Sequence, residues 1–211
     1  MKPLALSVSF LAALRLVGCA VAPGYVGPNE VSASPFFMSS RLQYRGFSME
    51  RPKSSAWFVR VSEQTHTHAI IRCRTSGRTH SAFVSADLRS LPRAASSEAD
   101  FAELCRQDQN PDTNRFTIVS YEQRPSHIQG QWAVEYEITT RDSGAPGSQG
   151  KTLTVLESGY VVSHPTFPDS VVRVRFSERA EAEALDPAVE AEGKEIMRGV
   201  RIESEPGKPV G

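Results

Sequence analysis

The chain has 211 residues, of which 39% are apolar and 23% are charged. This composition allows one domain of ordinary size with a packed core and excludes a chain that is disordered throughout. Basic and acidic residues number 24 each, so the formal net charge is zero and nothing in it calls for a nucleic-acid partner.

Residues 1–18 predict a cleaved export signal. Lys2 precedes an apolar run over residues 4–14, which is shorter than the roughly 20 apolar residues that span a bilayer. Residues 16–19, Leu-Val-Gly-Cys, then resemble the lipobox of bacterial lipoprotein precursors. Arg15 is the one departure from that pattern.

The resemblance implies a lipid anchor on Cys19. In that family the thiol is alkylated with diacylglycerol, a peptidase cuts just before the cysteine, and the new amine is usually acylated. The implied location is the cell envelope, on the outer membrane facing the periplasm or at the cell surface, because Ala20 rather than Asp follows the cysteine. Residues 19–40, with several Pro, Gly and Ser, are then expected to form a flexible tether.

Two other interpretations of the N-terminus stay open. An ordinary signal peptidase could cut after Ala22, although Pro23 would then follow the cut. The segment could instead remain as an uncleaved anchor, but Arg15 would cost about 2.5–3.5 kcal/mol at the centre of a membrane.

Charge is distributed unevenly along the chain. Residues 41–93 hold ten basic and three acidic residues, whereas residues 94–211 hold twelve basic and twenty acidic residues. The basic block could meet an anionic partner or lipid head groups. The alternative is that the two halves neutralise each other in the fold.

Alternating apolar and polar residues predict a body rich in strands. In residues 132–139, one face is apolar and the other carries Glu135 and Glu137, as in a half-buried antiparallel strand. Residues 142–150 hold three glycines and a proline and are expected to turn the chain. Further strands are expected at residues 57–61, 69–73, 82–88, 116–121, 152–156, 159–163 and 171–176.

Two helices are expected. Ser97 is a fitting N-cap for a helix over residues 97–106, with Asp100 as its capping-box partner. Asp186 and Pro187 are a fitting N-cap and first-turn residue for the second helix. Its apolar stripe consists of Val189, Gly193, Ile196, Met197 and Val200. The predicted fold is therefore α+β, an antiparallel sheet packed with two or more helices, over residues 41–202, with a loose tail at residues 203–211.

Residues 46–52, followed by Trp57, resemble the opening of PsbP-like domains. Those domains often begin with a glycine, an apolar residue, a proline and then a tryptophan that leads a strand. The order of the remaining elements is also similar, over residues 46–202. The resemblance implies an α/β sandwich and an accessory or assembly role that involves binding a larger partner. It carries over no catalytic set and no cofactor.

Two cysteines remain if Cys19 carries lipid. Cys73 falls on the apolar side of its expected strand, and Cys105 falls on the apolar stripe of its expected helix. Both therefore point inward, which favours a disulfide in an oxidising compartment. It would close a loop of about 32 residues and contribute roughly 3–4 kcal/mol. The alternative is two buried thiols, and no metal site is predicted because the cysteines lack CxxC or CxxH spacing.

Two histidines close in the sequence are candidate ligands of a zinc site. His66 and His68 would share one strand face, but no third zinc ligand is visible nearby, so we expect exposed polar residues there.

A possible functional surface is predicted where His164 and Arg179 flank the penultimate strand. A Ser/His/Asp hydrolase that also used Asp169 and Ser177 is conceivable, although no GxSxG elbow supports it.

The sequence thus predicts a lipid-anchored envelope protein. We expect a non-catalytic binding or accessory module with an envelope protein as partner, without a cofactor and without enzyme activity. The alternatives are a small periplasmic hydrolase around His164 and a structural envelope lipoprotein.

Overall fold

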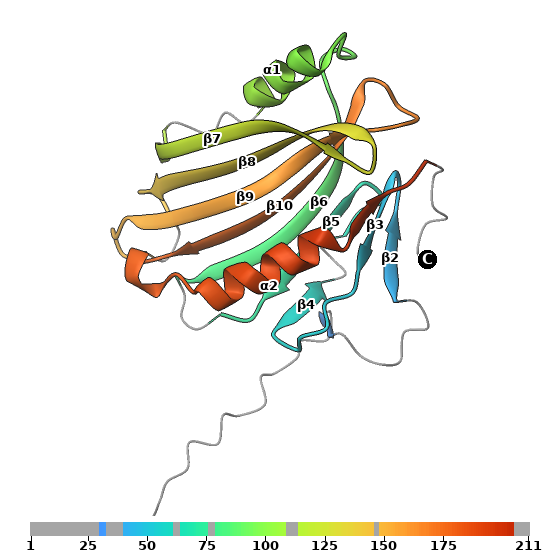
Figure 1. The fold of residues 1–211 in the computed structure, drawn as a ribbon. Helices are drawn as coiled ribbons and strands as arrows, with labels where there is room; N and C mark the ends of the chain where they lie inside the picture. Colours follow the sequence, from blue (N-terminus) through green and yellow to red (C-terminus); the bar gives the residue numbers. More distant parts are fainter. Residues whose placement is uncertain are drawn as a thin grey trace, which may run out of the picture.

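Two antiparallel sheets make up most of the structure, a computed structural model that describes residues 30–32, 40–60, 64–75, 79–108, 114–145 and 148–204. Together with two α-helices they establish the α+β class (Figure 1). The predicted signal, Cys19 and most of the predicted tail lie outside the described residues.

The large sheet has eight strands, and its middle is built from long antiparallel neighbours. In spatial order the strands are β1 (Glu30–Ser32), β4 (Trp57–Arg60), β5 (His68–Cys73), β6 (Ser81–Ser90), β10 (Ser170–Ala180), β9 (Leu153–Ser163), β8 (Gln131–Asp142) and β7 (Phe116–Ile128). The small sheet consists of β11 (Val200–Ile202), β3 (Phe47–Glu50) and β2 (Arg41–Tyr44).

Both predicted helices are present and begin at their predicted caps. In α1 (Glu98–Asp108) the backbone N–H of Asp100 donates to Ser97 Oγ, and the Asp100 carboxylate accepts from the N–H of Ser96. In α2 (Pro187–Arg198) the Asp186 side chain accepts from the N–H of Ala188 at 2.8 Å. A short 3-10 helix, η2 (Ala182–Ala184), precedes α2.

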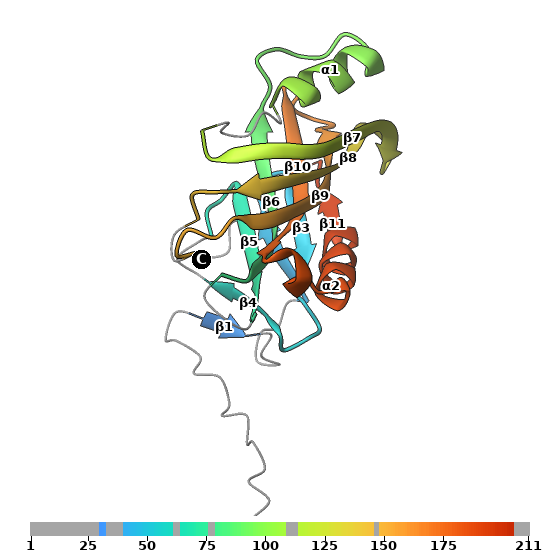
Figure 2. The ribbon, with the colours of Figure 1, turned by 90° about the vertical axis from the view of Figure 1, so that its left-hand side faces the viewer.

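The two faces of the large sheet hold separate cores. One face carries Val172, Val174 and Phe176 of β10, and it is covered by α2 and the small sheet. The other face carries Val134 and Tyr136 of β8, and it is covered by α1 near the β7 edge. Figure 2 shows α1 at one end of the molecule, with β1 and β4 at the other.

The strand prediction was wrong around Gly159, where two expected strands form the single strand β9. The glycine is no break in the strand. A Cβ atom there would come within 2.3 Å of the Val174 carbonyl oxygen, so glycine allows β9 and β10 to approach each other closely.

Residues outside the predicted domain range of 41–202 pair with the folded body at both ends. Residues 30–32, expected in the tether, pair with β4 as strand β1. At the other end, Gly199 caps α2, so Val200 begins β11 instead of extending the helix. Glu203, expected in the tail, donates its N–H to the Gly46 carbonyl and accepts from Ser48 Oγ.

Within the described residues, no helix has both the length and the apolar character needed to cross a membrane. The resemblance to PsbP-like domains stays a prediction.

Candidate binding site

An open groove of about 510 Å³ lies between α2 and strands β7, β8 and β9. Figure 1 shows these strands curving over the helix. Glu135 and Glu137, on the polar face of β8, form part of one wall, and Lys194 and Arg198 of α2 stand on the other. The polar face of β8, which the sequence pattern predicted to face solvent, therefore forms a wall of the groove.

The β7–β8 hairpin joins the two walls at one end. Gln129 and Gly130 have positive φ angles of 52° and 79°, as a two-residue type I′ turn requires. The Gln129 side chain donates to the Val200 carbonyl at 3.3 Å and accepts from the N–H of Ile202 at 3.1 Å. These two bonds hold the hairpin tip against β11, next to the C-terminal end of α2.

The groove floor contains a buried hydroxyl with an unmet hydrogen bond. Ser158 is 9% exposed, and its Oγ has no hydrogen-bond partner within the described part of the chain. Nearby, the Tyr160 hydroxyl donates to the Met197 carbonyl at 2.8 Å, and burial raises the pKa of Tyr160 well above its usual range. An unsatisfied buried polar group costs about 1–3 kcal/mol, so this hydroxyl is a local cost to the fold at the groove floor.

The charged groups of the walls are held in pairs. Arg124 hydrogen-bonds Glu135, which lowers the pKa of that carboxyl. Lys194 Nζ lies 2.7 Å from Glu190 Oε1 and 3.7 Å from Glu137 Oε1, and the Glu190 bond raises the pKa of Lys194. Exposed pairs of this kind are worth less than about 1 kcal/mol, so a ligand can exchange these partners at little cost.

His164 does not lie on a surface: it is 4% exposed. Its Nδ1 accepts the backbone N–H groups of Thr166 and Phe167, each at 3.2 Å, and its ring stacks on Phe167. Nε2 faces the backbone of Gly46, and burial lowers the pKa of the imidazole against the opposing effect of the Gly46 and Glu203 backbone. This geometry is that of a histidine that organises a turn, and it offers no support to the hydrolase alternative.

Arg179 lies far from His164. His164 precedes β10, whereas Arg179 is near the end of that strand. Nine residue steps along the strand, or about 30 Å, separate Ser170 from Arg179. There Arg179 Nη1 lies 3.5 Å from Asp142, a fully buried carboxylate whose closer partner is Arg115 at 2.6 Å. The two residues of the predicted functional surface therefore do not form one site.

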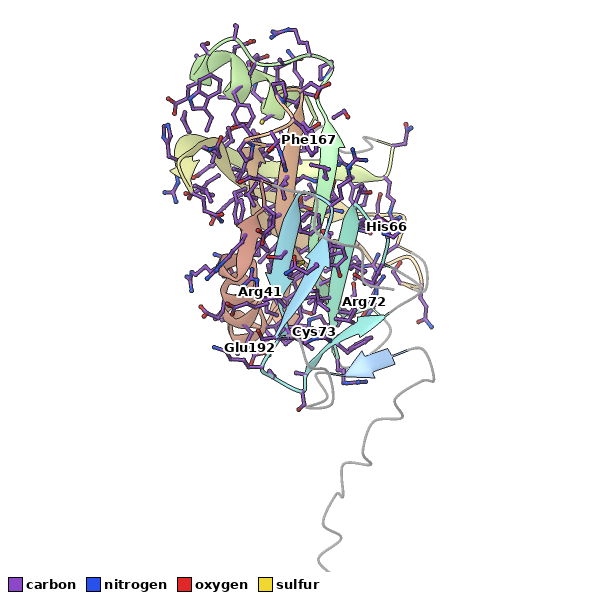
Figure 3. All side chains as sticks on the ribbon, turned by 90° about the vertical axis from the view of Figure 1, so that its right-hand side faces the viewer. Arg41, His66, Arg72, Cys73, Phe167 and Glu192 are labelled. Carbon is purple, nitrogen blue, oxygen red and sulfur yellow. The ribbon has the colours of Figure 1, made fainter. Side chains whose placement is uncertain are left out.

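In this structure neither Cys73 nor Cys105 is disulfide-bonded, contrary to the predicted pairing. Both side chains point inward as expected, but they enter different cores on opposite faces of the large sheet. In Figure 3, Cys73 lies toward the end of the molecule that carries β1, and α1, which holds Cys105, lies at the other end. Alternation along a strand indicates a face, and it does not indicate which core that face meets.

The histidine pair is separated by a turn. His66 is exposed, His68 begins β5, and an isolated bridge joins Thr65 to His68. Across the described ranges, no group of three or more His, Cys, Asp or Glu residues is placed to hold a metal ion.

Sequence reasoning missed the buried carboxylate of Glu178, which is 1% exposed. Its Oε1 lies 2.7 Å from His80 Nε2 and accepts the N–H of Asp186 at 3.0 Å. The pair thereby ties the start of β6 and the start of α2 to β10. Its spacing could have indicated this burial. Glu178 follows Val174 and Phe176 at every second position and therefore lies on the apolar face of its strand.

A scan against models of protein families finds no match to this chain, and no curated protein matches its sequence.

Proposed function

We propose that this chain is a lipid-anchored envelope protein whose folded domain binds a partner in the groove between α2 and strands β7–β9, without catalysing a reaction. The main support is the groove itself, whose walls carry ion pairs that a ligand can readily exchange. Its volume of about 510 Å³ falls within the range of ordinary ligand sites, about 300–1,000 Å³.

The anchor is supported by the lipobox-like residues that end at Cys19. Strand β1 begins at Glu30, eleven residues after this cysteine. Eleven residues span at most about 40 Å when fully extended. A lipid on Cys19 would therefore hold the β1 end of the domain within that distance of a membrane.

A binding role fits the groove chemistry better than catalysis. A serine nucleophile needs a base to activate it, whereas Ser158 Oγ contacts no hydrogen-bond partner within the described residues. The neighbouring acids and bases are engaged with each other, as Arg124 is with Glu135. Such groups can orient a partner by exchanging their bonds.

The test is site-specific photo-crosslinking in the native envelope. A photoreactive phenylalanine analogue at Glu122 or Glu137, both exposed beside the groove, should crosslink one defined partner. The matched control is Glu103, an exposed glutamate of α1 on the other side of the sheet, and it should not give that product.

A second variant links the crosslink to function. Arg198→Glu reverses a charge at an exposed position of the α2 wall and should remove the crosslink and reproduce the deletion phenotype, while the protein still folds and reaches the membrane. Crosslinking that is equal at Glu103 and Glu137, or a wild-type phenotype for a folded Arg198→Glu protein, would contradict binding in the groove.

A further inference from the structure

Strand β7 forms one edge of the large sheet, and among the described strands it pairs with β8 alone (Figure 1). Ile118 and Val119, near its start, are 45% and 55% exposed. They are the large apolar side chains that the described part of the chain leaves in solvent. An edge strand with apolar side chains is a template for pairing with another strand, and the pattern of its free backbone groups indicates which strand fits.

The free backbone groups of β7 follow from its register with β8. Bonded and non-bonded pairs alternate along two antiparallel strands. The two-residue turn at 129–130 makes Ile128 and Gln131 a bonded pair, so odd-numbered residues down to Tyr121 point their backbone groups away from β8. Pro125 agrees with this count because a proline has no N–H to donate to β8. Its missing N–H lies on the outer edge and ends regular pairing there.

A bulge at Val119 shifts the alternation. Ser120 pairs with Thr139, and Ile118 pairs with the next residue of β8, so Val119 has no partner in that strand. Ile118 therefore falls in a non-bonded pair, and on this side of the bulge the even-numbered residues point outward. The outward residues before Pro125 are Phe116, Ile118, Tyr121 and Gln123. Successive members of this set are two, three and two positions apart.

This spacing is the same when it is read from either end of the segment. A regular partner strand offers a bonding residue at every second position, so it stays in register with β7 on one side of the bulge only. A second copy of β7 that runs antiparallel matches both sides. Ile118 of each copy then lies opposite Tyr121 of the other copy, and Phe116 lies opposite Gln123.

We propose that β7 is the interface of a homodimer, in which two copies of the chain pair along residues 116–123 about a two-fold axis between residues 119 and 120. A two-fold interface requires a surface that is complementary to itself, and the spacing of the outward residues meets that requirement. The two large sheets then form one continuous sheet. The proposal rests neither on the lipid anchor nor on the groove beside α2.

The side chains are compatible with this register. Ile118 meets an aromatic ring of the other copy, and pairs of β-branched and aromatic residues stabilise antiparallel strands. Glu122, the one charged residue of the paired segment, lies opposite Thr117. Arg115 and Arg124 face each other just outside the segment, and each is bonded to a carboxylate of its own chain.

Cysteine crosslinking in cells that make the full-length chain tests the position of the axis. Val119→Cys places two thiols next to each other across the axis, and an oxidant should link them into a product of twice the chain mass. His127→Cys is the matched control, because it is an exposed position of the same strand. Its two copies would lie roughly 50 Å apart and should not crosslink. Cys73 and Cys105 are buried and should not react.

A charge at the axis should separate the two copies. Val119→Lys brings two like charges together at an exposed position, so the chain should still fold, as checked by urea unfolding. In sedimentation of the purified full-length protein we expect the mass of two chains for the wild type and for His127→Lys, and the mass of one chain for Val119→Lys.

Three results would overturn the proposal. They are a single-chain mass for the wild type at the highest concentration reached, a persistent dimer of folded Val119→Lys, and equal crosslinking of Val119→Cys and His127→Cys. If the lysine variant does not fold, the crosslinking and the wild-type mass decide the question by themselves.

Discussion

Gly193 of α2 lies directly against the ring of Phe176 in β10: a Cβ atom on the glycine would come within 2.2 Å of Phe176 Cδ2. The glycine therefore sets how closely the helix approaches the large sheet. The same helix forms one wall of the groove that Lys194 and Arg198 line.

Gly193→Ala should destabilise the fold. Alanine favours a helix by about 1 kcal/mol over glycine, but overpacking a tight core costs about 1–3 kcal/mol, and a 2.2 Å approach forces the helix or the ring to move. We expect a net loss of about 1–2 kcal/mol in the free energy of unfolding, measured with urea. The loss should be smaller in a Phe176→Leu background, and a stabilised Gly193→Ala protein would contradict the packing.

The stability of the fold should depend on pH through His164. Burial lowers its pKa in the folded state, so below the unfolded value of about 6.5 the unfolded chain binds more protons. The stability that comes from keeping His164 neutral in the fold is fully present above about pH 6.5. It is lost as the pH falls toward the folded-state pKa. Burial also lowers the pKa of His68, which makes the free energy of unfolding fall more steeply as the pH is lowered.

His164→Asn should reduce this slope because the amide cannot titrate yet can still accept a backbone N–H. The measurement is urea unfolding between about pH 7.5 and about pH 5.5. His127→Asn, at an exposed position of β7, is the matched control. A slope that is equal in the His164→Asn and wild-type proteins would show that His164 is not buried as a neutral imidazole.

Cys73 should be a slow nucleophile in the folded protein. Burial, followed by the carboxylates of Glu192, Glu178 and Asp186, raises the pKa of its thiol to about 11, so little thiolate is present at neutral pH. Alkylation without reductant should leave Cys73 unmodified in native protein and should modify both Cys73 and Cys105 after unfolding. A peptide pair linking Cys73 to Cys105 by mass analysis would instead restore the disulfide prediction.

Cys19→Ser should block maturation. Loss of the thiol removes the site of lipid attachment, and each buried methylene of that lipid is worth about 0.8 kcal/mol of membrane affinity. We expect the precursor to keep residues 1–18 and to remain in the inner membrane, as checked by intact mass and membrane fractionation. Normal processing and sorting of the variant would contradict the interpretation of the chain as a lipoprotein.

Local patterns in the sequence were sufficient for much of the fold. Alternation in residues 132–139 predicted both the strand β8 and its apolar face, which packs under α1. Ser97 and Asp186 predicted where the two helices begin. These signals are local because strand alternation and helix caps depend on neighbouring residues only.

Short elements were harder to predict from the sequence. The three or four residues of β1, β2, β3 and β11 are too few for a period to emerge, and each is stabilised by its partner strand. The groove was missed for a related reason. Its residues come from β7, β8, β9 and α2, and each segment taken alone has the pattern of an ordinary solvent-facing side.

The sequence by itself determined the α+β class, the caps of α1 and α2 and the inward direction of Cys73 and Cys105, because burial of an apolar face depends on the spacing of neighbouring residues. Only the tertiary structure decided that the two cysteines enter separate cores, that His164 supports a turn, and that the polar side of β8 faces α2 across a groove. Each of these depends on contacts between segments far apart in the chain, which a periodic pattern within one segment does not encode.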